Sequence, residues 1–123
     1  MFNRIFGSVF APGPGSDRIH MTDPREIKSW YDSGETLVLD VRENNEYAVE
    51  HIPGALHIPL SQFDPNRVPH DVAKTKKLVI HCRSGARCGM AASRLMASGW
   101  EGEIYRMSGG LMGWKSVGGP TER

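Results

Sequence analysis

The chain has 123 residues, of which 39% are apolar and 24% are charged, a composition typical of one globular domain with one core. Its formal net charge is +1, from 15 basic and 14 acidic residues. This balance argues against the broad positive field that non-specific nucleic-acid binding needs, so no nucleic-acid partner is expected.

The beginning of the chain differs in character from the rest. Residues 1–17 are expected to form a flexible N-terminal arm that ends in a Pro/Gly linker, the segment APGPGS. On the arm, Phe2, Phe6 and Val9 fall at roughly helical spacing, so an amphipathic turn that docks on a membrane or a partner is one interpretation. Because chain termini are usually mobile, we favour an arm that frays or packs on its own domain, and membrane contact through residues 1–10 is not expected.

Cysteine usage and hydropathy bear on the compartment. No stretch approaches the roughly 20 apolar residues of a membrane span, and Asn3, Arg4 and Gly7 interrupt the region where a signal peptide would be apolar. The two cysteines are Cys82 and Cys88, and a chain of this length has enough core not to need disulfides. These features predict a soluble, cytoplasmic protein.

The domain is expected at residues 18–123 and alternates strands with helices. Short apolar runs that are rich in β-branched residues and lack alternation predict strands buried on both faces of a parallel sheet. Helices are predicted where apolar residues recur at helical spacing between capping residues and glycines. In chain order the predicted elements are a helix from a cap at Thr22 or Asp23 to Gly34, a strand at 36–41, a helix at 43–49, strands at 55–58 and 77–82, a helix at 88–98, a strand at 103–107 and a helix at 109–117.

This alternation indicates an α/β domain with a largely parallel sheet that is covered on both faces. Catalytic loops of such sheets lie at the carboxyl ends of the strands. Cys82 ends the strand predicted at 77–82, which places it where such a loop begins.

The segment from Cys82 to Cys88 has the pattern of an anion-binding loop. It leads from a buried strand, through a turn with the permissive Gly85, into the N-terminus of a helix. The backbone N–H groups of such a loop point into one concavity, and the helix adds partial positive charge. With Arg83 and Arg87 nearby, the pKa of the Cys82 thiol should fall below its usual value of about 8.5. The loop therefore predicts an activated nucleophile that needs no histidine base.

Three segments resemble the signatures of the rhodanese family. CRSGAR at residues 82–87 is similar to the six-residue active-site loop of single-domain rhodaneses. LDVRE at 39–43, followed by Glu46-Tyr47 and by HIPGA at 51–55, resembles the first family signature, and GGLMGW at 109–114 resembles the second. The segments occur in the order of the family and span nearly the whole domain.

This resemblance implies a single rhodanese-like domain with a central, mostly parallel five-stranded sheet and helices on both faces. It also implies a sulfurtransferase in which Cys82 takes a sulfane sulfur from thiosulfate or a persulfide donor and then passes it to a thiol, protein thiols included, or to cyanide. No cofactor and no metal are implied. The donor is a small anion, and the residues expected to bind it are Arg83, Ser84, Gly85, Ala86, Arg87 and Cys88.

Two other functions are compatible with parts of the sequence. Cysteine-dependent phosphatases also place His-Cys at a strand end, but five residues separate their cysteine from an arginine, whereas only four separate Cys82 from Arg87. The shorter loop makes a tighter concavity, which suits a sulfur atom better than a phosphate ester. The main alternative is a non-catalytic rhodanese-like module that binds a partner or senses redox state through Cys82 and Cys88.

Three further residues have expected roles near the loop. Cys88 either fills space at the start of a helix, which we favour, or resolves a persulfide or sulfenate on Cys82 by forming a disulfide. Asp40 and Arg42 are expected to support the loop rather than to react. Asp40 would accept hydrogen bonds from loop amides, and Arg42 would pair with a carboxylate such as that of Glu50.

Overall fold

The computed structural model describes residues 13 and 15–123, so the contact considered for residues 1–10 lies outside the described part of the chain. Within that part, five strands form one sheet in the order β1-β5-β4-β2-β3, and all four pairings in this sheet are parallel. The predicted α/β class with a central five-stranded sheet is confirmed. The strands are β1 (Ile19–Thr22), β2 (Thr36–Asp40), β3 (Leu56–His57), β4 (Lys77–His81) and β5 (Ile104–Met107).

In the same residues, four α-helices and four short 3₁₀ turns connect the strands. Helix α2 begins as predicted, because Asp23 accepts a hydrogen bond from the Arg25 N–H and Pro24 opens the first turn. Helix α3 begins at a reciprocal capping box between Glu43 and Glu46. The helices are α2 (Pro24–Asp32), α3 (Asn44–Val49), α4 (Ala86–Ala97) and α5 (Gly110–Ser116), and the turns are η1 (Ser16–Arg18), η2 (Leu60–Gln62), η3 (Pro65–Arg67) and η4 (His70–Lys74). No helix between residues 15 and 123 is long and apolar enough to cross a membrane.

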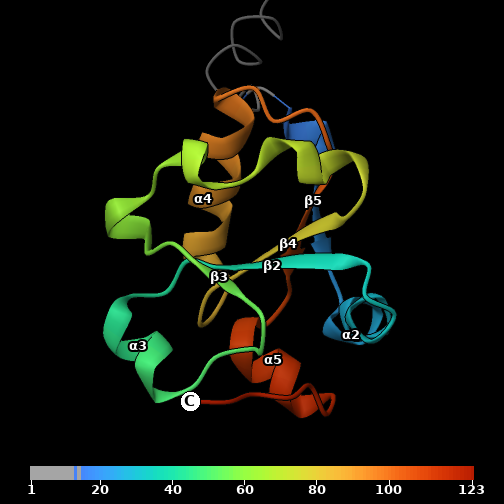
Figure 1. The fold of residues 1–123 in the computed structure, drawn as a ribbon, viewed down its shortest axis with the longest axis vertical. Coiled ribbons are helices and arrows are strands. Elements are labelled where there is room, and N and C mark those ends of the chain that lie inside the picture. Colours follow the sequence, from blue (N-terminus) through green and yellow to red (C-terminus); the bar gives the residue numbers. More distant parts are fainter. Residues whose placement is uncertain (1–12, 14) are drawn as a thin grey trace, which may run out of the picture.

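Helices cover both faces of the sheet, as Figure 1 shows, with α4 on one side and α2 and α5 on the other. Successive strand residues point to opposite faces, so Leu78 and Ile80 join one apolar cluster while Val79 joins the other. The first cluster packs against α4 and the 3₁₀ turns, and the second packs against α2 and α5. The central strands are therefore buried on both faces.

Strand β1 was not predicted from the sequence. It is an edge strand of four residues that pairs only with β5, and polar His20 and Thr22 break its apolar pattern. Its register with β5 aligns Ile19 with Ile104, and this long-range pairing makes the segment extended. An edge strand of this kind carries little local signal in its own residues.

The chain reverses direction across the sheet between β2 and β4. From β2 it continues outward to β3 on one side, and from β4 it continues to β5 on the other. The carboxyl ends of β2 and β4 thus flank a topological switch point, the place where open α/β sheets bind ligands. Cys82 follows β4 and Val41 follows β2, and the Val41 N–H donates to the His81 carbonyl oxygen at 3.1 Å.

A buried ion pair fastens the end of β2. Asp40 is fully buried and Arg42 is 4% exposed, and the Arg42 Nη2 lies 2.7 Å from the Asp40 Oδ2. Burial alone would raise the pKa of Asp40, but the hydrogen bonds from Arg42 hold it below its usual value. The Arg42 N–H also donates to the Asp40 carboxylate, as expected for an acidic residue at a strand end.

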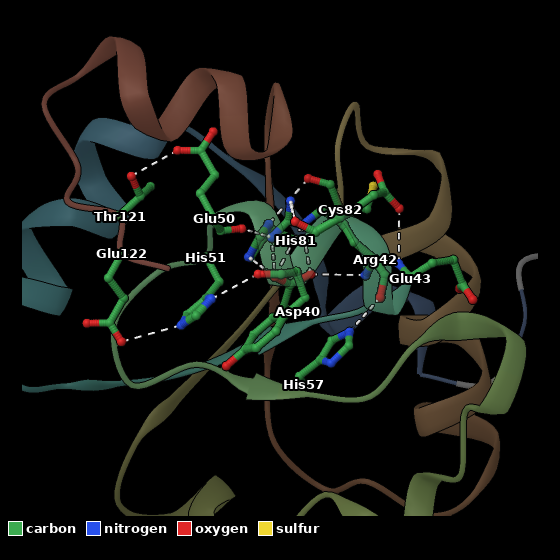
Figure 2. A network of polar contacts seen from close by, with 12 residues as sticks. Asp40, Arg42, Glu43, Glu50, His51, His57, His81, Cys82, Thr121 and Glu122 are labelled. Atoms are coloured by element: carbon green, nitrogen blue, oxygen red, sulfur yellow. Dashed lines mark hydrogen bonds and ion pairs between the residues drawn. The ribbon is translucent and has the colours of Figure 1, made fainter.

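Arg42 pairs with a carboxylate as expected, but with that of Asp40 and not that of Glu50. At Glu50, Arg42 Nη2 donates to the backbone carbonyl oxygen at 2.7 Å, while the carboxylate binds Thr121 (Figure 2). The same carboxylate also binds Lys115. Asp40, two residues before Arg42, already supplies the carboxylate that the guanidinium needs. Arg42 therefore links the end of β2 to the end of α3.

We expect Arg42→Met to lower the free energy of unfolding by about 3–5 kcal/mol at neutral pH, because it leaves the buried Asp40 carboxylate uncompensated. Lys28→Met is the matched control, since it breaks the more exposed pair with Asp32 and should cost less than about 1 kcal/mol. Urea denaturation measures both values. Equal losses in the two variants would contradict a special role of burial.

Candidate active site

The loop between β4 and α4 is short and sharply turned. Cys82 directly follows β4, and α4 begins at Ala86. Gly85 stands between them with a φ of 120°, a conformation that residues with a Cβ rarely adopt. The turn aims backbone N–H groups at the Cys82 sulfur, and the Gly85 N–H donates to it at 3.0 Å.

The Cys82 side chain is 1% exposed, yet its pKa falls from 9.0 to about 4. The hydrogen bond from the Cys88 thiol is the largest cause, and burial opposes it. The backbone N–H groups of Cys88, Gly85 and Ser84 lower the pKa further. The thiolate is therefore the main form at neutral pH, and it is held mainly by the loop's own amides and the neighbouring thiol rather than by arginine side chains.

Cys88 lies in the first turn of α4 and is fully buried. Its sulfur lies 2.9 Å from the Gly85 carbonyl oxygen, the carbonyl of the same residue whose N–H binds Cys82. The hydrogen bond to Cys82, together with burial, raises the pKa of Cys88 far above its usual value. Of the two adjacent sulfurs, Cys82 is thus the thiolate and Cys88 keeps its proton.

The two arginines of the loop are placed differently. Arg83 is exposed and makes no side-chain hydrogen bond within residues 15–123. Arg87 is half-buried and binds both oxygens of Glu46 on α3, at 2.5 and 2.9 Å. This contact holds the pKa of Glu46 at about 2 and raises the pKa of Arg87. The negative charge of Cys82 raises the pKa of Arg87 further. Arg87 therefore lies near the thiolate, while its donors are engaged by Glu46.

Helix α5 closes the loop from behind through its first residue. The Leu111 N–H donates to the Cys82 carbonyl oxygen at 3.0 Å. At Gly110, which has a φ of 57°, an added Cβ would lie 2.2 Å from the Arg83 carbonyl oxygen and 2.4 Å from that of Cys82. Only glycine allows this approach, so Gly110 in the segment GGLMGW fixes the back of the loop.

His81 precedes the reactive cysteine but does not face its sulfur. Its Nδ1 lies 3.3 Å from the Cys82 carbonyl oxygen, and its Nε2 lies 3.5 Å from Asp40 Oδ2 (Figure 2). Burial lowers the pKa of His81, so the ring is neutral at neutral pH. The expectation of a nucleophile without a histidine base agrees with this placement.

Arg106 on β5 lies at the loop but was not predicted from the sequence as a site residue. Its Nη2 donates to the Gly85 carbonyl oxygen at 2.7 Å, and its Nε lies 3.5 Å from the Cys88 sulfur. In the register of β5 on β4, Arg106 pairs with Ile80, two residues before Cys82. A single arginine in a strand carries no local signal, so only the strand order could have brought it to the loop. Within the described ranges, 13 and 15–123, no group of three or more histidine, cysteine or acidic residues could hold a metal ion.

Comparisons with known proteins agree on one family. The model of the rhodanese-like domain matches residues 23–117. A sulfurtransferase of Allochromatium vinosum is 36% identical over 72% of this chain and 80% of its own length, and an uncharacterized protein of Synechocystis is 37% identical over 80% of this chain. The chain spans 53% of the Synechocystis protein. Among solved structures, the rhodanese-like domain of an Anabaena protein superimposes with a TM-score of 0.71 at 29% identity, covering 83% of this chain and 77% of that one.

The lowered pKa of Cys82 leads to a direct expectation for its reactivity. Because the thiolate persists down to about pH 4, the rate of alkylation by iodoacetamide should be nearly constant from about pH 8 to pH 5 and fall only below that range. An ordinary thiol would lose about a factor of ten per pH unit over the same range. Peptide mapping separates this rate from that of Cys88, and a tenfold loss per unit at Cys82 would contradict the arrangement described.

Proposed function

Because this chain belongs to the rhodanese-like domain family, we propose that it transfers a sulfane sulfur from thiosulfate or a persulfide donor to a thiol or cyanide through a persulfide on Cys82. The observation that carries the proposal is the Cys82 sulfur, ionised although almost fully buried. The proposal includes the donor, the acceptor and the reaction steps. It also includes a domain that spans residues 18–123 and a cytoplasmic location, because a reducing compartment keeps the two cysteines as free thiols.

In the first step, the Cys82 thiolate attacks the outer sulfur of thiosulfate. The new bond joins Cys82 Sγ to that sulfur, the sulfur–sulfur bond of the donor breaks, and sulfite leaves with the electron pair. The N–H groups that hold the thiolate, those of Ser84, Gly85 and Cys88, are then free to stabilise the charge that moves to the outer sulfur. The same donors serve the resting enzyme and the loaded one.

In the second step, the acceptor attacks the outer sulfur of the persulfide. Cyanide leaves as thiocyanate, or a thiol leaves as a new persulfide, and the electron pair of the broken sulfur–sulfur bond returns to Cys82. The amides that surround Cys82 Sγ favour this departure, because they stabilise the thiolate that forms. A low pKa of the leaving thiol speeds such exchange.

The donor is a dianion, and Arg87 is the cation best placed to attract it. It is close enough for the Cys82 charge to raise its pKa, and Glu46 fixes its orientation. Arg83 is exposed on the same loop without such a tether. We infer that Arg87 recognises the donor, whereas the Cys88 thiol and the backbone amides, and not Arg87, generate the thiolate.

Single-thiol variants test the nucleophile. In Cys88→Ser, which keeps Cys82, incubation with thiosulfate should add about 32 Da, the mass of one sulfur, and cyanide should remove it as thiocyanate. Cys82→Ser, which keeps Cys88, should gain nothing. Intact mass spectrometry after acid quenching gives the readout. A stable adduct on Cys82→Ser would refute the assignment, and the lack of an adduct on Cys88→Ser would favour a non-catalytic module.

If Arg87 recognises the donor and does not ionise Cys82, its substitution should affect donor use but not the pKa of Cys82. Arg87→Gln should lower kcat/KM for thiosulfate about tenfold, equivalent to about 1.4 kcal/mol, while the pH profile of Cys82 alkylation stays in place. Arg83→Gln is the matched control on the same loop and should change kcat/KM less. If Arg87→Gln shifted the alkylation profile toward that of an ordinary thiol, the division between recognition and ionisation would be wrong.

A further inference from the structure

The proposed transfer uses the Cys88 thiol as a hydrogen-bond donor to Cys82 but gives its sulfur no bond to form. That sulfur is fully buried and close to the one that reacts. Both sulfurs bind one residue, since the Gly85 N–H donates to Cys82 Sγ at 3.0 Å and the Gly85 carbonyl oxygen lies 2.9 Å from Cys88 Sγ. The two thiols are therefore held on a single turn, against the N–H and the carbonyl oxygen of the same residue.

A cation lies behind the second sulfur. Arg106 Nε is 3.5 Å from Cys88 Sγ, and its Nη2 is anchored on the Gly85 carbonyl oxygen at 2.7 Å. Among residues 13 and 15–123, no carboxylate pairs with Arg106, in contrast to Arg42 with Asp40 and Arg87 with Glu46. A guanidinium with no anionic partner beside a buried thiol is the environment in which a second thiolate would be stabilised.

We propose that Cys88 attacks the Cys82 persulfide, so that the chain releases hydrosulfide and ends as a Cys82–Cys88 disulfide. This step rests on the proposed function, because it begins from the loaded Cys82. It adds a second activity, thiosulfate-dependent sulfide release, to the transfer of sulfur to an external acceptor. A dithiol reductant would be needed to restore the two thiols.

The step balances without an external oxidant. The proton of Cys88 passes to the outer sulfur of the persulfide, and the Cys88 sulfur attacks Cys82 Sγ. A Cys88–Cys82 bond forms, the bond from Cys82 to the outer sulfur breaks, and HS⁻ leaves with the electron pair. The sulfane sulfur is reduced to sulfide while the two cysteine sulfurs are oxidised to a disulfide.

Arg106 would act on this step as a positioning residue. It contacts Cys88 rather than the donor, so it stabilises negative charge on Cys88 as the proton leaves. Its Nη2 and the Cys88 sulfur share the Gly85 carbonyl oxygen as acceptor, which fixes the guanidinium beside Cys88. Loading of Cys82 does not involve Arg106, so the two steps can be measured apart.

The test uses the reduced full-length chain with thiosulfate and no cyanide or thiol. Wild type should release about one sulfide per chain and become about 2 Da lighter than the reduced protein, with both cysteines protected from alkylation until a dithiol is added. Cys88→Ser should keep its added sulfur and release no sulfide. Sulfide is measured colorimetrically in the same samples whose masses are taken.

Variants of Arg106 test whether its charge stabilises the Cys88 thiolate or whether its side chain only supports the loop. Arg106→Gln should load sulfur on Cys82 normally but release sulfide about tenfold more slowly, with the release profile shifted to higher pH, because the Cys88 thiolate loses its counter-charge. Arg106→Lys, which keeps the charge, should recover part of the rate. Arg94→Gln, on the exposed side of α4, is the matched control and should leave both steps unchanged.

The outcomes distinguish the two proposals. If wild type keeps the added sulfur, releases no sulfide and leaves Cys88 open to alkylation after denaturation, the resolving step is overturned and the transfer proposal stands. If neither wild type nor Cys88→Ser takes up sulfur, both proposals fail. The wild-type result alone decides the inference even if a variant fails to fold.

Discussion

The structure depends on one buried negative charge, that of the Cys82 sulfur. A thiolate with 1% of its surface exposed has lost most of its hydration, and this loss opposes ionisation. The loop replaces water with N–H groups from three residues and with the Cys88 thiol, and these donors outweigh the cost of burial. They converge only if the turn keeps its shape. The positive φ of Gly85 and the close approach of Gly110 both serve that requirement.

The surrounding ion pairs keep other charges from disturbing this site. Arg42 and Asp40 neutralise one another within the fold, and Arg87 and Glu46 do so at its edge. Arg87 is therefore oriented by a carboxylate, which leaves the Cys88 thiol and the loop amides as the main determinants of the Cys82 pKa. In the proposed transfer, such a site would release sulfite or accept a thiol without a strong fixed charge that holds either one.

Much of the fold could be predicted because the decisive patterns are local. A few neighbouring residues are enough to recognise each of these patterns. They are the buried runs around Leu39 and Val79, the caps of α2 and α3, and the glycine of the loop. The edge strand β1 and the place of Arg106 could not be found in this way. Each depends on which strands become neighbours, and that information is spread over the whole chain.

The length of the loop links the chemistry of the two cysteines. In a phosphatase loop, the position of Cys88 would hold the arginine that grips a phosphate ester. Here Arg87 comes one residue earlier and turns to Glu46, while the position of Cys88 falls on the buried side of the first turn of α4. A long cation there would have to displace the apolar cluster, whereas a small thiol fits and can donate to Cys82. The same shortening therefore places a second sulfur on the turn that holds the first, with both sulfurs against Gly85.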